Sequence, residues 1–375
     1  MTKKNQKPSS NEERIKQLEE RIKELESIIK TIRSGLLMQL DCVDSSGIDF
    51  DTKEEETNNA WEELEKLVGI GADVNQEDEP KEEPKEEPKV GSGVVNEDEL
   101  KEALDKLNSL IGLAEVKKQI NEWVKQVRIF QERRARGIPA SPLSYHMVFT
   151  GNPGTGKTTV ARLVAQIYHA LGISATDSVK ETDRDGLVAS YYGQTVLKTN
   201  EVIDKAMGGI LFIDEAYTLK QDDRDTFGQE AIDALLKAME DKRDQLVVII
   251  AGREEEMKKF IGTNPSLETR FKNFINLKDY NGEELFTILE TYIRKYKHVL
   301  DERAKSKLSK YCQSIYENRG EDFENAKTVR EMFEKLILCQ SSRLASEYDD
   351  LSQVDDVMMK TITEEDADGV IYATK

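Results

Sequence analysis

The residues best placed to do chemistry lie at positions 151–158, which read Gly-Asn-Pro-Gly-Thr-Gly-Lys-Thr between an apolar run and a helix-like stretch. A strand that ends in glycines points backbone N–H groups and a helix N-terminus into one concavity, which binds a polyphosphate. We expect Lys157 to reach the β- and γ-phosphates of ATP and Thr158 to hold Mg²⁺. The nucleotide-binding residues predicted in this segment are Gly151, Asn152, Pro153, Gly154, Thr155, Gly156, Lys157, Thr158 and Thr159.

A second group of reactive side chains follows the apolar stretch 210–213, where Asp214 and Glu215 end a predicted strand. In phosphate-loop enzymes an acid at the first of these positions orients Mg²⁺ through water. A carboxylate one residue further can accept a proton from the water that attacks the γ-phosphate. Taken alone, an apolar strand that ends in two acidic residues often only marks the point where a strand meets a polar loop. Beside a phosphate loop it predicts ATP hydrolysis, with Lys157 and Glu215 as catalytic residues.

Together these motifs resemble those of the AAA+ ATPases, and within them the group that contains red-type Rubisco activase and the stage V sporulation protein K-like ATPases. Residues 151–159 resemble the Walker A motif, and 211–217 resemble the Walker B motif with Asp-Glu-Ala-Tyr intact. Residues 110–113 resemble the segment that closes over adenine, which implies nucleotide contacts for Ile111 and Gly112. The resemblance runs from about residue 100 to the mid-340s and leaves the first 96 residues uncovered.

The resemblance also implies an arginine finger and a substrate loop. Residues 264–271 resemble the family segment at the subunit edge, so Arg270 is expected to reach the γ-phosphate bound by the next subunit. Residues 187–193 resemble the first pore loop, where Tyr191 and Tyr192 would grip an extended polypeptide. From the residues alone, a surface arginine and two tyrosines that pack a loop against the sheet are the simpler interpretation.

A further segment, at 324–330, resembles the sensor-2 region of the family lid. Relatives commonly read Gly-Asn-Ala-Arg there, and this chain has lysine at the last of these positions. Lysine lacks the planar fork that arginine offers to a phosphate. The resemblance therefore implies nucleotide contacts for Lys327 and Arg330 jointly, and the sensor-1 position near Gly252-Arg253 stays unassigned.

These motifs need a scaffold that brings strand ends together. From residue 97 on, apolar runs alternate with amphipathic helical stretches, which predicts a parallel sheet with helices on both faces. The fold class is therefore α/β with a separate small helical domain at the C-terminal end, and the resemblance implies that these are a P-loop AAA+ sheet and its helical lid domain. Strands are expected near 145–150, 178–182, 209–214 and 245–251. Helices are expected near 97–107, 113–136, 157–171, 195–207, 228–242, 253–261, 281–297, 301–318 and 327–346, with only helical patterns after about residue 281.

The N-terminal region has a different pattern. Seven apolar residues fall on alternating three- and four-residue steps: Ile15, Leu18, Ile22, Leu25, Ile29, Ile32 and Leu36. This a/d seam, with opposite charges at e and g positions, predicts a short two-stranded coiled coil over 1–39. A lone amphipathic helix docked on the same chain is the alternative. A polar, acidic and Pro-rich linker is expected over 40–96, the nucleotide-binding α/β domain over 97–278 and the helical lid over 279–375.

Composition restricts the class of protein. The net charge of −19 and the pI near 4.9 argue against a nucleic-acid partner, because phosphate neutralisation needs clustered Lys and Arg. Cys42, Cys312 and Cys339 are odd in number and widely spaced, which argues against a disulfide framework or a zinc site. No apolar stretch reaches membrane-spanning length. We therefore expect a cytoplasmic protein without nucleic-acid or membrane partners.

Two functions fit these features best. The first, implied by the resemblance, is a ring-forming ATPase motor, a homo-hexamer or other ring, that remodels a protein client through tyrosine loops in a central pore. The second is a nucleotide-dependent switch or adaptor whose coiled coil recruits or scaffolds a partner. A small-molecule kinase is a weaker third interpretation, because it leaves Arg270 and the helical C-terminal domain unexplained. Neither the client nor any small-molecule effector can be identified from the sequence.

Overall fold

The computed structural model describes residues 94–139, 143–191, 193–222, 224–348, 350 and 353–373. All of them fall within one unit of the chain, Pro84–Lys375. The predicted coiled coil over 1–39, nearly all of the predicted linker over 40–96, and Tyr192 lie outside the described residues. Within the described ranges, no helix is long and apolar enough to cross a membrane.

Five parallel strands form the central sheet, in the order β2-β3-β4-β1-β5. They are β1 (Met147–Thr150), β2 (Val179–Thr182), β3 (Ile210–Ile213), β4 (Val247–Gly252) and β5 (Asn273–Asn276). Every residue of β1, β3 and β4 is buried, because helices cover both faces of the sheet. The predicted α/β class and parallel sheet are confirmed. Strand β5 is absent from the predicted strands, since the sequence Asn-Phe-Ile-Asn is short and half polar.

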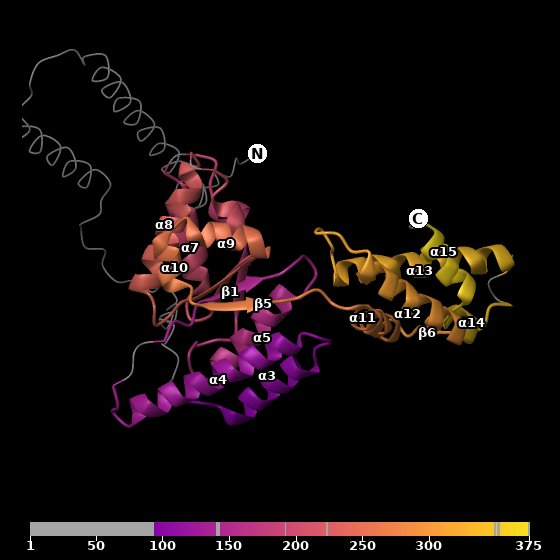
Figure 1. Cartoon of the computed structure of the whole chain (residues 1–375), viewed down its shortest axis with the longest axis horizontal. Coiled ribbons are helices and arrows are strands. Elements are labelled where there is room, and N and C mark those ends of the chain that lie inside the picture. Colours follow the sequence, from indigo (N-terminus) through magenta and orange to yellow (C-terminus); the bar gives the residue numbers. More distant parts are fainter. Residues whose placement is uncertain are drawn as a thin grey trace, which may run out of the picture. The chain divides into compact units, whose positions relative to one another are not determined.

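Three helices cover one face of this sheet (Figure 1). They are α3 (Glu97–Ser109), α4 (Ala114–Ala135) and α5 (Lys157–Ala170). Successive strand residues point to opposite faces, so Phe149 and Phe212 pack on this side with Leu107 of α3 and Tyr168 of α5. Asn96 begins α3 by accepting a hydrogen bond from the Glu99 N–H.

The opposite face is covered by the remaining helices of the α/β domain (Figure 1). They are α6 (Arg184–Leu187), α7 (Thr195–Ala206), the 3₁₀ turn η1 (Ala216–Leu219), α8 (Thr226–Asp241), α9 (Glu254–Gly262) and α10 (Pro265–Arg270). Val148, Leu211 and Ile250 are the strand residues that point to this side. The two apolar layers hold the sheet rigidly, so the loops at its edges start from fixed points.

The C-terminal lid has its own apolar core, around Leu289, Leu308 and Leu336. Its elements are α11 (Gly282–Lys295), β6 (Val299–Leu300), α12 (Glu302–Glu317), α13 (Ala326–Glu347), α14 (Asp356–Lys360), β7 (Thr361–Ile362) and α15 (Glu364–Ala373). The prediction of only helices after residue 281 is wrong in one respect, because β6 and β7 pair as a parallel two-stranded sheet. Two-residue strands are too short to leave an alternating pattern in the sequence.

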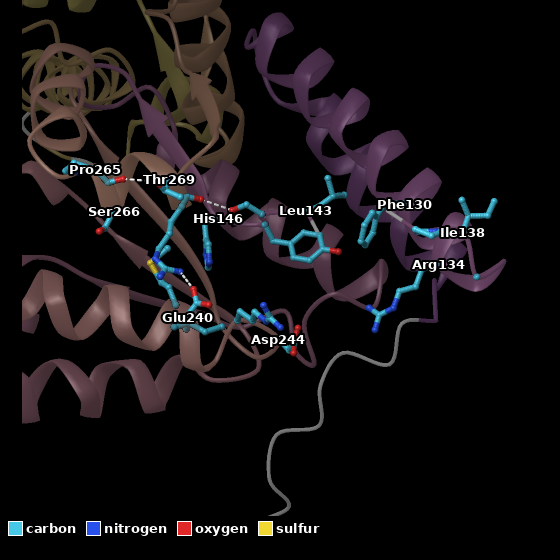
Figure 2. A pocket seen from close by; sticks show the side chains of 18 residues that line it. Phe130, Arg134, Ile138, Leu143, His146, Glu240, Asp244, Pro265, Ser266 and Thr269 are labelled. Atoms are coloured by element: carbon cyan, nitrogen blue, oxygen red, sulfur yellow. Dashed lines mark hydrogen bonds and ion pairs between the residues drawn. The ribbon is translucent and has the colours of Figure 1, made fainter. Parts of the chain in front are cut away.

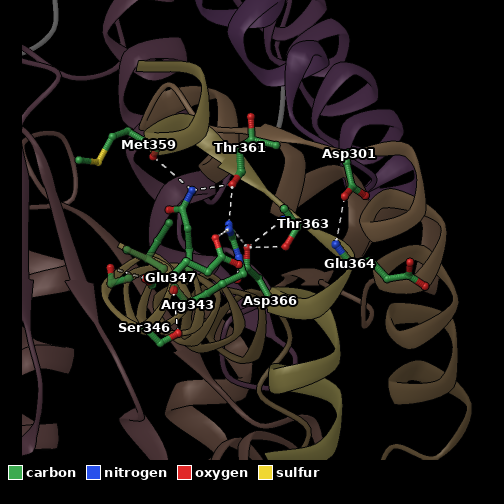
Figure 3. A network of polar contacts seen from close by, with 12 residues as sticks. Asp301, Arg343, Ser346, Glu347, Met359, Thr361, Thr363, Glu364 and Asp366 are labelled. Carbon is green, nitrogen blue, oxygen red and sulfur yellow. Dashed lines mark hydrogen bonds and ion pairs between the residues drawn. The ribbon is translucent and has the colours of Figure 1, made fainter. Parts of the chain in front are cut away.

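A buried ion pair ties α13 to the end of the lid (Figure 3). Arg343 donates from Nε and Nη2 to the two carboxylate oxygens of Asp366, over 2.9 and 3.1 Å. Asp366 is 1% exposed and also accepts bonds from the backbone N–H and the hydroxyl of Thr363. Gln340 donates to the Thr361 carbonyl over 2.8 Å. These bonds fix β7 and α15 against α13.

Arg343→Ala should destabilise the lid strongly, because it leaves the Asp366 carboxylate buried without its partner. Breaking a buried pair in this way costs about 3–5 kcal/mol. Urea denaturation would measure the free energy of unfolding. Arg330→Ala is the matched control, since its pair with Glu334 on the same helix is exposed and should contribute little. Equal losses in the two variants would contradict the structural role given to Asp366.

Candidate active site

The phosphate loop leaves the sheet at the carboxyl end of β1. The Gly151 N–H donates to the Gly252 carbonyl of β4 over 3.1 Å. Gly151 has a φ of +147°, and a Cβ there would lie 2.3 Å from the Leu277 carbonyl oxygen, so only glycine fits beside the strand end. Gly156 caps α5 without a side-chain bond, which leaves the N–H groups of the first helical turn free to bind an anion.

Two backbone carbonyls of the phosphate loop hold the side chain of Lys157 over the loop. Its Nζ donates to the carbonyls of Gly151 and Asn152 over 2.9 and 3.0 Å. Burial lowers the pKa of Lys157, and the charges of Asp214 and Glu215 act in the opposite direction. The charges of both acids of the second motif thus act on the lysine of the first motif.

The backbone around the acids explains how they are presented. The Asp214 N–H donates to the Thr182 carbonyl over 2.9 Å, and the Asp214 carboxylate accepts from the Glu215 N–H over 3.0 Å. Glu215 adopts left-handed backbone angles (φ +46°, ψ +43°), and Thr218 donates from its N–H and hydroxyl to the Glu215 carbonyl. This turn leaves the Glu215 side chain exposed at the strand end, where it can reach water.

The residues of the site fit ATP with Mg²⁺. The glycine turn and the start of α5 supply N–H donors, and Lys157 supplies a cation for phosphate oxygens. Thr158 follows Lys157 on the first turn of α5 and is half-buried, as is Asp214 at the end of β3. Hydroxyl and carboxylate oxygens, completed by phosphate oxygens, are the donors that Mg²⁺ prefers. Thr159 is exposed on the same helical turn.

The predicted adenine segment lies between α3 and α4. Ile111 packs against the apolar core of the lid, and Gly112 has a φ of +62°. A Cβ on Gly112 would lie 2.4 Å from Glu284 Oε1 of α11, so this segment touches the lid at the start of α11. Nucleotide contacts of Ile111 and Gly112 stay a prediction.

The side chains of the predicted sensor-2 residues form ion pairs along their own segment, although the backbone N of Lys327 lies beside Gly154 of the phosphate loop. Lys327 pairs with Glu324 over 2.6 Å, and Arg330 pairs with Glu334 over 3.0 Å; both cations are exposed. The structure does not bring them to Lys157. Their roles at a bound nucleotide stay a prediction.

Other residues meet the site without having been given a role from the sequence. Arg253, at the carboxyl end of β4, pairs with Asp322 of the lid. Burial is the main cause of the lowered pKa of Lys157, and the charge of Arg253 acts in the same direction with a smaller effect than the opposing charges of Asp214 and Glu215. Asn325 donates to the Pro153 carbonyl of the phosphate loop over 3.2 Å. Contacts between segments so far apart leave no spacing signal in the sequence, although Asn325 stands inside the segment that resembles sensor 2.

Arg270 ends α10 and lines a cavity of about 970 Å³. Figure 2 shows this cavity with the neighbouring Thr269 and Glu240 labelled. The Nη1 of Arg270 pairs with Glu240 of α8 over 2.7 Å, and the Arg270 carbonyl accepts a bond from the Ser144 hydroxyl over 2.7 Å. The next residue, Phe271, packs against the His146 ring with centroids 6.0 Å apart. These contacts hold the segment against the start of β1.

The sheet register separates Arg270 from the phosphate loop of the same protomer. Arg270 precedes β5, whose first residue Asn273 pairs with Met147 at the start of β1. The phosphate loop follows Thr150 at the other end of β1. The two therefore lie at opposite edges of one parallel sheet. The register thus separates the half-buried Arg270 from the phosphate loop of its own chain by the length of β1.

Tyr191 lies on a loop between α6 and α7 and is 71% exposed. The loop starts from an anchored base: Thr199 donates to the Leu187 carbonyl over 3.1 Å, and Lys198 donates to the Val188 carbonyl over 2.9 Å. The base of the loop is therefore held in place, and the aromatic ring of Tyr191 is presented to solvent. Tyr192, its predicted partner, is outside the described part of the chain.

A phosphate loop and an Asp-Glu strand end on a parallel sheet of order 2-3-4-1-5, followed by a helical lid, define an AAA ATPase. The chain belongs to the ATPase family associated with various cellular activities (AAA), whose family model matches residues 147–278. The model of the AAA lid domain matches residues 281–373. The chain therefore binds and hydrolyses ATP as a member of this family.

Similar proteins narrow the assignment within this family, and they confirm the group that the sequence motifs indicate. The chain is 38% identical to stage V sporulation protein K of Bacillus subtilis over 246 residues, 65% of this chain and 76% of the relative. It is 40% identical to the chromosomal protein CbxX of Cupriavidus necator over 259 residues, 68% and 80% of the two chains. The chloroplastic ribulose bisphosphate carboxylase/oxygenase activase of Cyanidioschyzon merolae is 40% identical over 248 residues, 66% and 84%.

His146 should make the stability of the α/β domain depend on pH. It is buried and accepts a hydrogen bond from the Val248 N–H over 3.0 Å, and burial lowers its pKa from 6.5 to about 4. The unfolded chain therefore binds a proton that the folded chain excludes, so the free energy of unfolding should fall as pH drops from 6.5 towards 4. Between pH 6.5 and 5 the loss should be on the order of 1 kcal/mol.

Urea titrations of the wild type and His146→Asn at both pH values would measure this loss. Asparagine keeps an acceptor for the Val248 N–H and does not titrate, so its curve should be flatter over this range. The same pH dependence in both proteins would show that His146 is not the titrating group.

Proposed function

We propose that this ATPase works as a ring in which ATP lies between neighbouring protomers and Arg270 of one protomer completes the site of the next. The observation that carries this proposal is the register of β1 with β5, which puts Arg270 and the phosphate loop at opposite edges of the sheet. A ring needs two unlike edges that meet head to tail, and such heterologous contacts form a closed ring when the rotation from one protomer to the next closes. An arginine supplied in this way stabilises the charge that develops on the transferred phosphate.

The contacts of Arg270 suit this role. Its partner Glu240 is 60% exposed, so the ion pair is screened by water and can open at small cost. The backbone of the segment is fixed more firmly, because the Asn273 side chain donates to the carbonyls of Ser144 and His146 over 2.6 and 3.0 Å. The guanidinium can therefore leave Glu240 while its attachment to the sheet stays in place.

In the proposed reaction, Lys157 binds the β- and γ-phosphates, and Glu215 orients the attacking water and accepts its proton. Thr158 and Asp214 would hold Mg²⁺, which neutralises phosphate charge when bound. The partial burial of Lys157 strengthens its attraction to a phosphate, because charges interact more strongly where water is excluded.

We further propose a protein client, contacted by Tyr191. An exposed aromatic ring on an anchored loop can bind a polypeptide through contact area, with little preference for sequence. The name of one relative, an activase of ribulose bisphosphate carboxylase/oxygenase, describes action on another protein and supports this class of client. Function depends on sites and partners, so the client of this chain has to be found by experiment.

Mixing two inactive variants would test the shared site. Lys157→Ala should lose nucleotide binding, and Arg270→Ala should lose on the order of 10³-fold in turnover while still binding ATP. In an equal mixture that exchanges subunits, about a quarter of the interfaces join an intact phosphate loop to an intact Arg270, because heterologous contacts form at random. Turnover of the mixture should therefore recover to about a quarter of wild type.

Glu240→Gln serves as a control in the same assay, since it removes the partner of Arg270 and keeps the guanidinium. A mixture that stays as inactive as its two components would show that Arg270 does not act on a neighbouring site.

Tyr191→Ala should separate ATP turnover from work on a client. A Glu215→Gln variant, which should bind ATP without hydrolysing it, would first capture the client for identification by mass spectrometry. With that client, Tyr191→Ala should retain turnover within about twofold and lose remodelling, because the loop grips the client and does not touch the nucleotide. Tyr191→Phe keeps the ring and should retain both activities. Undiminished remodelling by Tyr191→Ala would refute the assigned role.

A further inference from the structure

A cluster of polar side chains joins the phosphate loop to the lid. Asp279 follows β5, and its carboxylate accepts from Asn152 Nδ2 of the loop over 3.0 and 3.3 Å. The same carboxylate accepts from Asn325 Nδ2 of the lid over 2.8 Å and pairs with Arg319 Nε over 3.4 Å. We call Asp279, Asn325 and Arg319 the lid node.

Asn325 is the most constrained member of the lid node. It is fully buried and has a φ of +49° and a ψ of −120°, backbone angles that favour glycine. Its Oδ1 accepts from the Tyr280 N–H over 2.9 Å, and its Nδ2 also donates to the carbonyls of Pro153 and Phe323, each over 3.2 Å. Such a backbone persists only where surrounding contacts determine it. The hydrogen bonds of the Asn325 side chain therefore stabilise its unfavourable backbone angles.

Further contacts reach the middle of the phosphate loop, residues 152–155, which we call the crest of the loop. The Ala326 N–H donates to the Gly154 carbonyl over 3.2 Å, and the Tyr280 hydroxyl donates to the Thr155 carbonyl over 3.1 Å. A Cβ on Gly154 would lie 2.1 Å from the Glu324 carbonyl oxygen, so the two backbones are in direct contact. Lid-side groups thus engage four consecutive loop residues, 152–155, through carbonyls and one side chain. Because these bonds use loop carbonyls and the Asn152 side chain, the backbone N–H groups of the loop stay free to bind phosphates.

We propose that Asp279 and Asn325 are positioning residues, which hold the crest of the phosphate loop in its binding shape while the lid is docked. Nucleotide affinity and release then depend on the state of the lid. This inference rests on the proposed placement of ATP on the phosphate loop. The shape of the loop matters equally for bound ATP and for its transition state, so the lid node should affect KM and leave kcat nearly unchanged.

Asp279→Ala in the full-length protein tests the inference. It removes the acceptor of Asn152 and Asn325, so the KM for ATP and the dissociation rate of mant-ADP, a fluorescent ADP analogue, should both rise about tenfold. The kcat should stay within about twofold of wild type. Asp279→Asn keeps an acceptor oxygen and should restore most of the affinity. Asp368→Ala is the matched control, because its carboxylate binds Lys307 over 2.7 Å within the lid.

Further variants decide the remaining outcomes. If Asn152 acts through Asp279, the Asn152→Ala/Asp279→Ala double variant should raise KM no more than Asp279→Ala does. Asn325→Gly is the alternative variant if Asp279→Ala does not fold. Glycine tolerates the backbone angles at this position, so the fold should be kept, and the loss of the Asn325 side chain should still raise KM. A wild-type KM and mant-ADP release rate in Asp279→Ala or Asn325→Gly would overturn the inference. Lys157→Ala separates the two proposals, since normal mant-ADP binding in that variant would refute the placement of ATP itself.

Discussion

The parallel pairing of β1 with β4 on one side and β5 on the other is the constraint on which the rest of this structure depends. At one end of β1, Thr150 pairs with Gly252 and with Asn276, so the phosphate loop starts beside the ends of both neighbouring strands. Asp279 follows one of those strand ends and accepts from Asn152 of the loop. Arg253 follows the other strand end, and its charge acts on Lys157. At the other end of β1, the same pairing collects His146 and the segment before Asn273. The pairing of β1 with its two neighbours therefore positions both the phosphate loop at one edge of the sheet and the segment before Asn273 at the other edge.

Charge balance at the carboxyl edge depends on this closeness. A half-buried lysine is unfavourable alone, and Asp214 and Glu215 offset part of that cost because β3 ends beside β4, the neighbour of β1. Arg253 adds a second cation near Lys157. The site thus carries positive groups on the side of the loop and carboxylates on the side of β3. A phosphate chain with its metal ion matches this separation of charges.

The parts that could be predicted from the sequence are those encoded by neighbours in the chain. The phosphate loop, the strand ending in Asp214 and Glu215, and most helices follow from spacing and apolar period, and the family they indicate is confirmed. Strand β5 and the β6–β7 pair escape prediction because their ladders depend on distant partners. The bonds of Asn325 to Asp279 and to Pro153 depend on how the lid docks, which no local pattern encodes. Lys327 and Arg330 form exposed ion pairs with Glu324 and Glu334, and their predicted contacts with a nucleotide stay a prediction.

The location of Arg270 at the far edge has a genetic consequence. In the proposed ring, a chain that lacks this guanidinium keeps an intact phosphate loop and withholds help from the adjacent copy. In a cell that expresses normal and altered alleles together, the defect therefore passes from the product of one allele to the product of the other. Loss of Lys157 stays confined to the chain that carries it. Each altered chain disables one site in either case, but a change at Arg270 disables a site on the adjacent copy, whose own phosphate loop can be intact.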